Sequence, residues 1–264
     1  MKPSPPRTPA DGVPDLWERI DAASETWLVL DYDGTLAPFR RNRMDAVPVE
    51  GAIEDLVTIR DSGATRLAML TGRPLSELLE LVGDLGIPMV GSHGFEFLLE
   101  DGSIEREELS SGQEERLETA EREARSIAPD ARIERKPASV GLHTRGMPEP
   151  AARELHERVA EAWRQDAEQN ELEVRSFSGG VELRLKAIHK GTALERLLEG
   201  HRKPALCVYV GDDETDEDAF AALPDGGVGI KVGPRGVPTR ARGRLDDPFA
   251  VKEFLDTWIA TTAR

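Results

Sequence analysis

The stretch LVLDYDGTLAPF, residues 28–39, decides the fold of this chain. Leu28, Val29 and Leu30 form a continuous apolar run, which is typical of a strand buried on both faces of a parallel sheet. The run ends at Asp31, and a second carboxylate, Asp33, follows one residue later. An Asp-Gly turn in water is the plain alternative. A carboxylate at the end of a buried strand is costly unless it is paired or binds a metal, so we predict a functional site here.

Two further apolar runs have the same character and end in small or acidic residues. They are TRLAML at 65–70 and ALCVYV at 205–210. Helical patterns with apolar residues near a 3.6-residue period follow the first two runs, at 49–63 and 74–86. Strands that alternate with helices predict an α/β fold with a Rossmann-like, doubly wound parallel sheet.

The middle of the chain has a different pattern. Residues 108–185 read as helix, strand, strand, helix, strand, strand, with charged helices and short alternating strands joined by tight turns. This pattern favours a small antiparallel sheet in an inserted α+β lid, or cap, domain. We expect the catalytic core to comprise residues 25–107 and 186–264, and residues 1–24 to be a flexible, proline-rich tail and lead-in.

Composition limits the function classes that are compatible with the sequence. The 264 residues carry a net charge of −16, which argues against nucleic acid as the main partner. The single cysteine, Cys207, excludes a disulfide within the chain. Residues 1–14 lack the apolar segment of a signal peptide, and no apolar stretch approaches the roughly 20 residues of a membrane helix. We expect a soluble, cytoplasmic protein without a membrane segment, and a monomer.

The polar strand ends are predicted to converge, because ligands of doubly wound sheets bind outside the carboxyl ends of the strands. In this arrangement Asp31 can attack a phosphorus atom, and Asp33 can protonate the leaving group and later deprotonate water. Gly34 allows the backbone to pass close beneath the phosphoryl group. The side chains expected around this crevice are Asp31, Asp33, Thr71, Asp212, Asp213 and Asp216.

A carboxylate-rich site that accepts a phosphate suits Mg²⁺. We predict that Asp31, the Asp33 carbonyl and Asp212 hold the metal, with Asp216 ordering them and Asp213 as a further candidate. Lys190 opens a predicted helix, where a cation is unfavourable unless it serves an anion, so we assign it to charge neutralisation. Thr71 either holds a phosphate oxygen or caps the next helix.

These residues together resemble the haloacid dehalogenase superfamily of phosphohydrolases. The resemblance is carried by DYDGT at 31–35, Thr71, Lys190 and GDDETD at 211–216. A lid inserted between the second and third of these motifs looks like the C2 class of that superfamily, which implies small-molecule substrates.

A closer resemblance, to the trehalose-6-phosphate phosphatase family, extends over nearly the whole chain from residue 25. It is carried by DYDGTLAPF, TGRP, GSHGFE, VYVGDDETDEDAF and the lid segment ERKPASVGLHTRG. It implies Mg²⁺-dependent hydrolysis of trehalose 6-phosphate through an aspartyl-phosphate. His189 and Thr144 depart from the family, which usually has aspartate and tyrosine there. The substrate-binding residues expected in addition to the core motifs are Gly34, Gly72, Arg73, His93, Lys136, His143, Arg145 and Glu182.

The sequence is also compatible with other roles for these residues and with other substrates. Charged residues on a lid sheet often simply form its solvent-exposed face. Arg73 could pair with a carboxylate instead of binding substrate. Other glycosyl phosphates, such as sucrose phosphate or mannosyl-3-phosphoglycerate, would suit the same core. A sugar phosphomutase or a silent regulatory subunit would fit these motifs less well than a phosphatase does. A trehalose-6-phosphate synthase is the expected functional partner.

Overall fold

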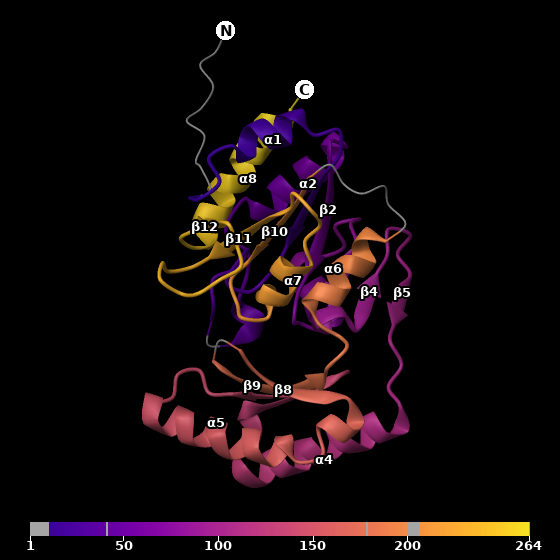
Figure 1. Cartoon of the computed structure of the whole chain (residues 1–264), viewed down its shortest axis with the longest axis vertical. Coiled ribbons are helices and arrows are strands. Elements are labelled where there is room, and N and C mark those ends of the chain that lie inside the picture. Colours follow the sequence, from indigo (N-terminus) through magenta and orange to yellow (C-terminus); the bar gives the residue numbers. More distant parts are fainter. Residues whose placement is uncertain (1–10, 41, 178, 200–205, 264) are drawn as a thin grey trace.

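The core of the computed structural model is an eight-stranded sheet with helices on both faces (Figure 1). The structure describes residues 11–40, 42–177, 179–199 and 206–263. In spatial order the strands are β12 (Gly243–Leu245), β11 (Val228–Val232), β10 (Leu206–Gly211), β1 (Thr26–Leu30), β2 (Thr65–Leu70), β3 (Met89–Gly91), β4 (Glu96–Leu98) and β5 (Ile104–Arg106). The first six are parallel, and β4 and β5 extend the sheet as antiparallel strands. The predicted α/β fold is therefore confirmed.

The two faces of the sheet carry separate hydrophobic clusters, because successive side chains of β1 point to opposite sides. Leu28 and Leu30 join the cluster formed with α1 (Leu16–Ala22), α2 (Ala52–Ser62), α3 (Leu75–Val82) and α8 (Pro248–Thr262). Trp27 and Val29 join the cluster formed with α6 (Lys190–Leu198) and α7 (Asp216–Ala222). Burial on both faces explains why the strands are apolar throughout.

The centre of the sheet is the point where the strand order reverses. β1 pairs in parallel with β2 on one side and with β10 on the other, and the chain then proceeds outward in both directions. A crevice forms outside the carboxyl ends of strands at such a point, and ligands bind there. The residues that follow β1, β2 and β10 therefore face one another.

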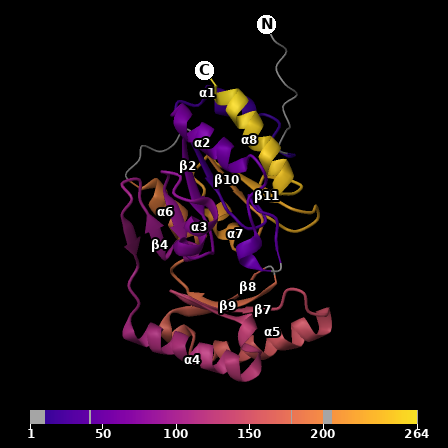
Figure 2. The ribbon, with the colours of Figure 1, turned by 180° about the vertical axis from the view of Figure 1, so that it is seen from behind.

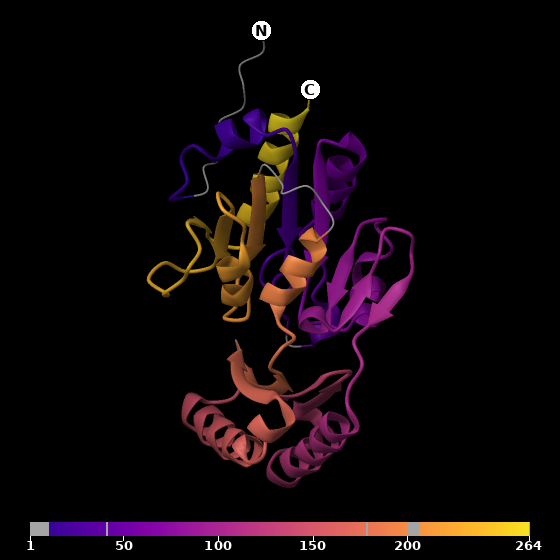
Figure 3. The same ribbon diagram turned by 45° about the vertical axis from the view of Figure 1, so that its right-hand side comes forward.

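A second, four-stranded antiparallel sheet forms the cap (Figures 2 and 3). Its strands, in spatial order, are β6 (Ile133–Lys136), β7 (Ser139–His143), β9 (Gly180–Leu185) and β8 (Leu172–Phe177). α4 (Ser111–Ile127) and α5 (Glu149–Arg164) cover the face away from the core and pack on Val181 and Leu183. The alternate residues Glu182 and Arg184 consequently point to the core.

Short 3₁₀ helices complete the described elements. They are η1 (Arg43–Asp45), η2 (Ser92–Gly94), η3 (Asp130–Arg132) and η4 (Glu168–Asn170). None of the helices in the described ranges combines the length and apolar character that crossing a bilayer requires.

Part of the expected tail and lead-in, residues 1–24, forms a packed helix in the structure. Residues 1–10 lie outside the described residues, but α1 packs its buried Leu16, Trp17 and Ile20 against the core. The ring centroid of Trp17 lies 5.1 Å from that of Phe254 and 6.5 Å from that of Trp258. This helix has only seven residues, about two turns, so its apolar periodicity was too short to stand out beside the proline-rich residues that precede it.

We predict that Trp17→Ala destabilises the protein by about 3–5 kcal/mol, because it removes a large buried side chain from the packed α1–α8 contact. The free energy of unfolding in urea measures this effect. Ala22→Ser, on the exposed end of the same helix, is the control and should change it by less than about 0.5 kcal/mol. A Trp17→Ala value near that of the control would mean that α1 is not part of the core.

Candidate active site

A buried lysine links the ends of three core elements. Asp31 directly follows β1, and its N–H donates to the carbonyl of Val210 on β10 at 2.9 Å. Lys190 Nζ, at the first residue of α6, donates to Asp31 Oδ1 at 2.8 Å and to Asp216 Oδ1 at 2.7 Å. Lys190 is only 2% exposed, so these two carboxylates are what make its burial tolerable.

Asp216 is fixed by further donors besides Lys190. The Tyr209 hydroxyl donates to its Oδ1 at 2.6 Å, and the Asp213 N–H donates to its Oδ2 at 2.8 Å. Burial opposes ionisation of Asp216, but Lys190 and these donors hold its pKa below the usual value. Asp216 is therefore an anchor for the lysine. Tyr209 was missed by the sequence analysis, because it looked like one more residue of an apolar strand.

The carboxylates near this lysine fit a divalent cation. Oxygen atoms of Asp31, Asp212 and Asp216 lie within 4.8 Å of one another. Asp212 Oδ1 is buried and has no hydrogen-bond partner among the described residues. Burial raises the pKa of Asp31 to about 7, with Lys190 opposing and Asp216 adding to the rise. Burial and the neighbouring carboxylates also raise the pKa of Asp212 well above its usual value. A cation would relieve this repulsion.

Gly34 lets the backbone turn directly against Asp212. It has a φ of +73°, and a Cβ atom there would lie 2.2 Å from Asp212 Oδ2. Gly72 has a comparable contact in the next loop, where a Cβ atom would lie 2.5 Å from the His93 ring. Both glycines thus allow polar side chains to approach the backbone at the carboxyl ends of the strands.

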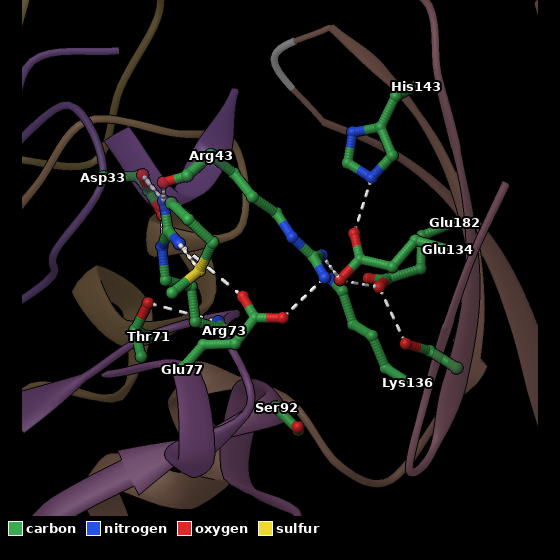
Figure 4. A network of polar contacts seen from close by, with 12 residues as sticks. Asp33, Arg43, Thr71, Arg73, Glu77, Ser92, Glu134, Lys136, His143 and Glu182 are labelled. Carbon is green, nitrogen blue, oxygen red and sulfur yellow. Dashed lines mark hydrogen bonds and ion pairs between the residues drawn. The ribbon is translucent and has the colours of Figure 1, made fainter. Parts of the chain in front are cut away.

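Arg73 pairs with the second carboxylate of the first motif (Figure 4). Its Nε and Nη2 donate to Asp33 Oδ2 at 2.6 Å and to Asp33 Oδ1 at 2.7 Å. Its Nη2 also donates to the carbonyl of Arg43 at 2.7 Å, and its guanidinium lies 5.2 Å from the centroid of the Tyr32 ring. Of the two expected roles of Arg73, the structure therefore contains the carboxylate pair. Thr71 Oγ1 accepts the Arg73 N–H at 3.3 Å.

The cap reaches the core through Glu182. Its Oε1 accepts from Lys136 Nζ at 2.9 Å and from Ser139 Oγ at 2.8 Å, and His93 Nε2 of the core lies 3.3 Å from its Oε2. Burial opposes ionisation, but Lys136 and His93 hold the pKa of Glu182 well below its usual value. Lys136, His93 and Glu182, all predicted from the sequence, are thus brought together.

The backbone around His93 is unusual. Ser92 and His93 have φ values of 49° and 60°, in the left-handed region that non-glycine residues rarely occupy. The N–H of Ser92 donates to Arg73 O at 2.8 Å, and the N–H of His93 donates to Thr71 O at 3.0 Å. Strained residues of this kind concentrate at functional sites, where the surrounding structure holds them in place.

The remaining predicted cap residues, His143 and Arg145, also line the cavity. His143 Nε2 lies 2.6 Å from Glu134 Oε2, and burial lowers the pKa of His143 to about 4. Arg43 of the core pairs with Glu134 and, at 2.5 Å, with Glu77 (Figure 4). The Arg145 guanidinium lies 4.0 Å from the Phe39 ring centroid. Arg43, Phe39, Glu134 and Ser139 were missed, although Glu134 stands two residues before Lys136 on the same sheet face.

His189, which departs from the resembling family, caps α6. Its Nδ1 accepts from the N–H groups of Gly191 at 3.2 Å and Thr192 at 3.4 Å. A ring nitrogen thus meets the free amides that a carboxylate oxygen would otherwise meet. Thr144 lies at the end of β7, where its N–H donates to Gly179 O at 2.7 Å.

Residues of the core and of the cap line a cavity of about 840 Å³, a size within the ~300–1,000 Å³ typical of small-molecule sites. Gly34 and Asp216 are not among the residues that line it. The predicted residues that line it are Asp31, Asp33, Thr71, Gly72, Arg73, His93, Lys136, His143, Arg145, Glu182, Lys190, Asp212 and Asp213.

Known proteins share both the sequence pattern and the fold. Residues 29–248 match the trehalose-phosphatase family. The trehalose-phosphate phosphatase of Mycobacterium marinum is 32% identical over 237 residues, which cover 85% of this chain but 59% of that protein. The C-terminal domain of Candida albicans trehalose-6-phosphate phosphatase superposes with a TM-score of 0.84 at 21% identity, covering 98% of this chain and 99% of that one.

A second Candida albicans structure shows how widely the fold is used. The C-terminal domain of a trehalose synthase regulatory protein superposes with a TM-score of 0.74 at 12% identity, covering 90% of this chain and 96% of that one. Such low identity shows the fold alone. The match to the family over residues 29–248 shows more: this chain belongs to the trehalose-phosphatase family.

Proposed function

We propose that this chain hydrolyses trehalose 6-phosphate to trehalose and inorganic phosphate. The observation that carries the proposal is the Asp31–Lys190 pair beside Asp212, whose buried Oδ1 has no hydrogen-bond partner among the described residues. Both lie on the core side of a cavity whose other side is the polar face of the cap sheet. Family membership and the relatives named trehalose-phosphate phosphatase support the choice of substrate. The chain spans 59% of the length of the Mycobacterium marinum relative, so we propose the phosphatase activity for the region that the two proteins share.

In the first half of the proposed reaction, Asp31 acts as the nucleophile. One of its carboxylate oxygens forms a bond to phosphorus as the bond from phosphorus to the sugar oxygen breaks, giving an aspartyl-phosphate. Asp33 gives its proton to the departing sugar oxygen. In the structure both oxygens of Asp33 accept from Arg73, so this step requires the guanidinium to move off the carboxyl group.

In the second half, water releases the phosphate. Asp33, now ionised, takes a proton from the water, whose oxygen attacks phosphorus and displaces the Asp31 carboxylate. Lys190 neutralises charge on the nucleophile and on the phosphoryl group throughout, and Asp216 keeps its ammonium group in place.

Mg²⁺ is the cation that this donor set suits. Asp31, Asp212 and the Asp33 carbonyl would hold it, and an all-oxygen set with a phosphate is the usual magnesium environment. When bound, the ion supplies positive charge that offsets repulsion between the carboxylates and the phosphate. Asp216 supports this set from behind, and Asp213 contributes its backbone N–H to Asp216.

The cap residues would recognise the sugar. Glu182, Lys136 and His143 offer both donors and acceptors to hydroxyl groups, and Arg145 lies at the same wall of the cavity. Sucrose phosphate and mannosyl-3-phosphoglycerate stay as alternative substrates, because a polar sheet of this kind suits several sugars. A silent subunit is disfavoured by the intact set Asp31, Asp33, Lys190 and Asp212. The proposal includes a cytoplasmic monomer that works with a trehalose-6-phosphate synthase.

We predict Mg²⁺-dependent phosphate release with a preference of about a hundredfold or more, some 3 kcal/mol, for trehalose 6-phosphate. The measurement compares it with sucrose 6-phosphate, glucose 6-phosphate and mannosyl-3-phosphoglycerate, each with Mg²⁺ and with EDTA. Preference for another member of the panel would keep the core chemistry and overturn the sugar assignment. No release from any of them would favour the silent subunit.

Asp31→Asn should lower turnover by at least about 10³-fold, because the amide cannot act as the nucleophile. Binding of trehalose 6-phosphate, measured by calorimetry, should survive. Asp61→Asn, at an exposed position of α2, is the control for loss of one negative charge. Steady-state hydrolysis by Asp31→Asn near the rate of this control would remove Asp31 as the nucleophile.

Glu182→Ala should raise the KM for trehalose 6-phosphate about tenfold or more, because charge-assisted hydrogen bonds to the sugar are lost. The KM for p-nitrophenyl phosphate, which has no sugar, should change by less than about threefold. Glu154→Ala, on the exposed side of α5, should change neither value. Equal effects of Glu182→Ala on both substrates would show that Glu182 does not read the sugar.

A further inference from the structure

A cluster of four charged residues joins the cap to the core outside the cavity. Arg175 on β8 and Arg184 on β9 both reach Asp218, in the first turn of α7, at 3.3 Å and 3.0 Å. Arg184 also donates to Glu173 Oε1, directly across the strand pair, at 2.8 Å. Both arginines belong to the cap, whereas Asp218 belongs to the core.

Burial makes the partner of Arg184 matter. Arg184 is only 3% exposed, and its Nη1 has no hydrogen-bond partner among the described residues. A buried cation is costly unless it is paired. Arg184 would keep Glu173 wherever the cap lies, because both residues belong to the cap sheet. Asp218, by contrast, loses both of its cations if the cap moves away from the core.

The two ends of this link are rigidly tied to the site. Arg184 stands two residues after Glu182 on the same face of β9, about 7 Å along the strand. Asp218 stands two residues after Asp216, the anchor of Lys190. A Cβ atom at Gly191 would lie 2.6 Å from Asp218 O, so α7 is packed directly against the turn that carries Lys190.

We propose that Asp218 is a positioning residue that seats Glu182 over the phosphate site by receiving Arg184 and Arg175. It touches no reacting atom and is not part of the cavity wall. Asp218 thereby affects the discrimination between substrates. When the link is intact, the cap residues that contact the sugar are held in position over the site where the phosphoryl group reacts. This inference rests on the proposed function for its substrate.

The test compares Asp218→Asn with wild type on two substrates. We expect kcat/KM for trehalose 6-phosphate to fall about tenfold or more, and that for p-nitrophenyl phosphate to change by less than about threefold. Asp218→Glu keeps the charge and should retain most of the preference. Asp225→Asn, which removes a charge from an exposed loop after α7, should have no effect.

Small-angle X-ray scattering on the same proteins separates this proposal from the proposed function. Asp218→Asn should have a larger radius of gyration than wild type and Asp225→Asn, because the cap is less firmly seated. If wild type does not hydrolyse trehalose 6-phosphate, the proposed function fails and the scattering still tests the link. Equal losses on both substrates, or an unchanged radius of gyration, would overturn the proposal.

Discussion

The Lys190 ammonium between Asp31 and Asp216 is the contact on which the arrangement of this site depends. A buried cation at the start of a helix is opposed both by burial and by the helix dipole. Two carboxylates from different elements offset that cost, one after β1 and one at the start of α7. Because Lys190 is reached only after the chain has traversed the cap, this contact also closes the core around the insertion.

The two sheets divide the functions between them for a physical reason. The core sheet is covered on both faces, so polar side chains are tolerated only where its strands end. The cap sheet is covered by α4 and α5 on one face alone, so every second residue on its strands can be polar. The open face of the cap therefore supplies donors and acceptors, and the strand ends of the core supply the carboxylates that we propose as nucleophile and acid.

The charge of the chain is reversed locally at the cavity. A net charge of −16 would repel a phosphate ester, yet arginine and lysine side chains line both walls of the site. Four of them, Arg43, Arg73, Lys136 and Lys190, are held by carboxylates, as Arg73 is by Asp33 and Lys136 is by Glu182. Such pairing keeps the groups ordered without substrate, which lowers the entropic cost of binding.

The sequence by itself determined the parallel core, the order of elements in the cap and the residues of the four core motifs. These features are encoded locally, by continuous apolar runs, helical periodicity and polar residues at strand ends. Only the tertiary structure revealed the packed helix α1, the antiparallel extension β4–β5 and the pairing of Arg73 with Asp33. It also revealed the contacts of Tyr209, Arg43 and Asp218, whose partners come from other elements. Pairing between distant residues depends on how elements pack in space, and periodicity along the chain carries no record of that.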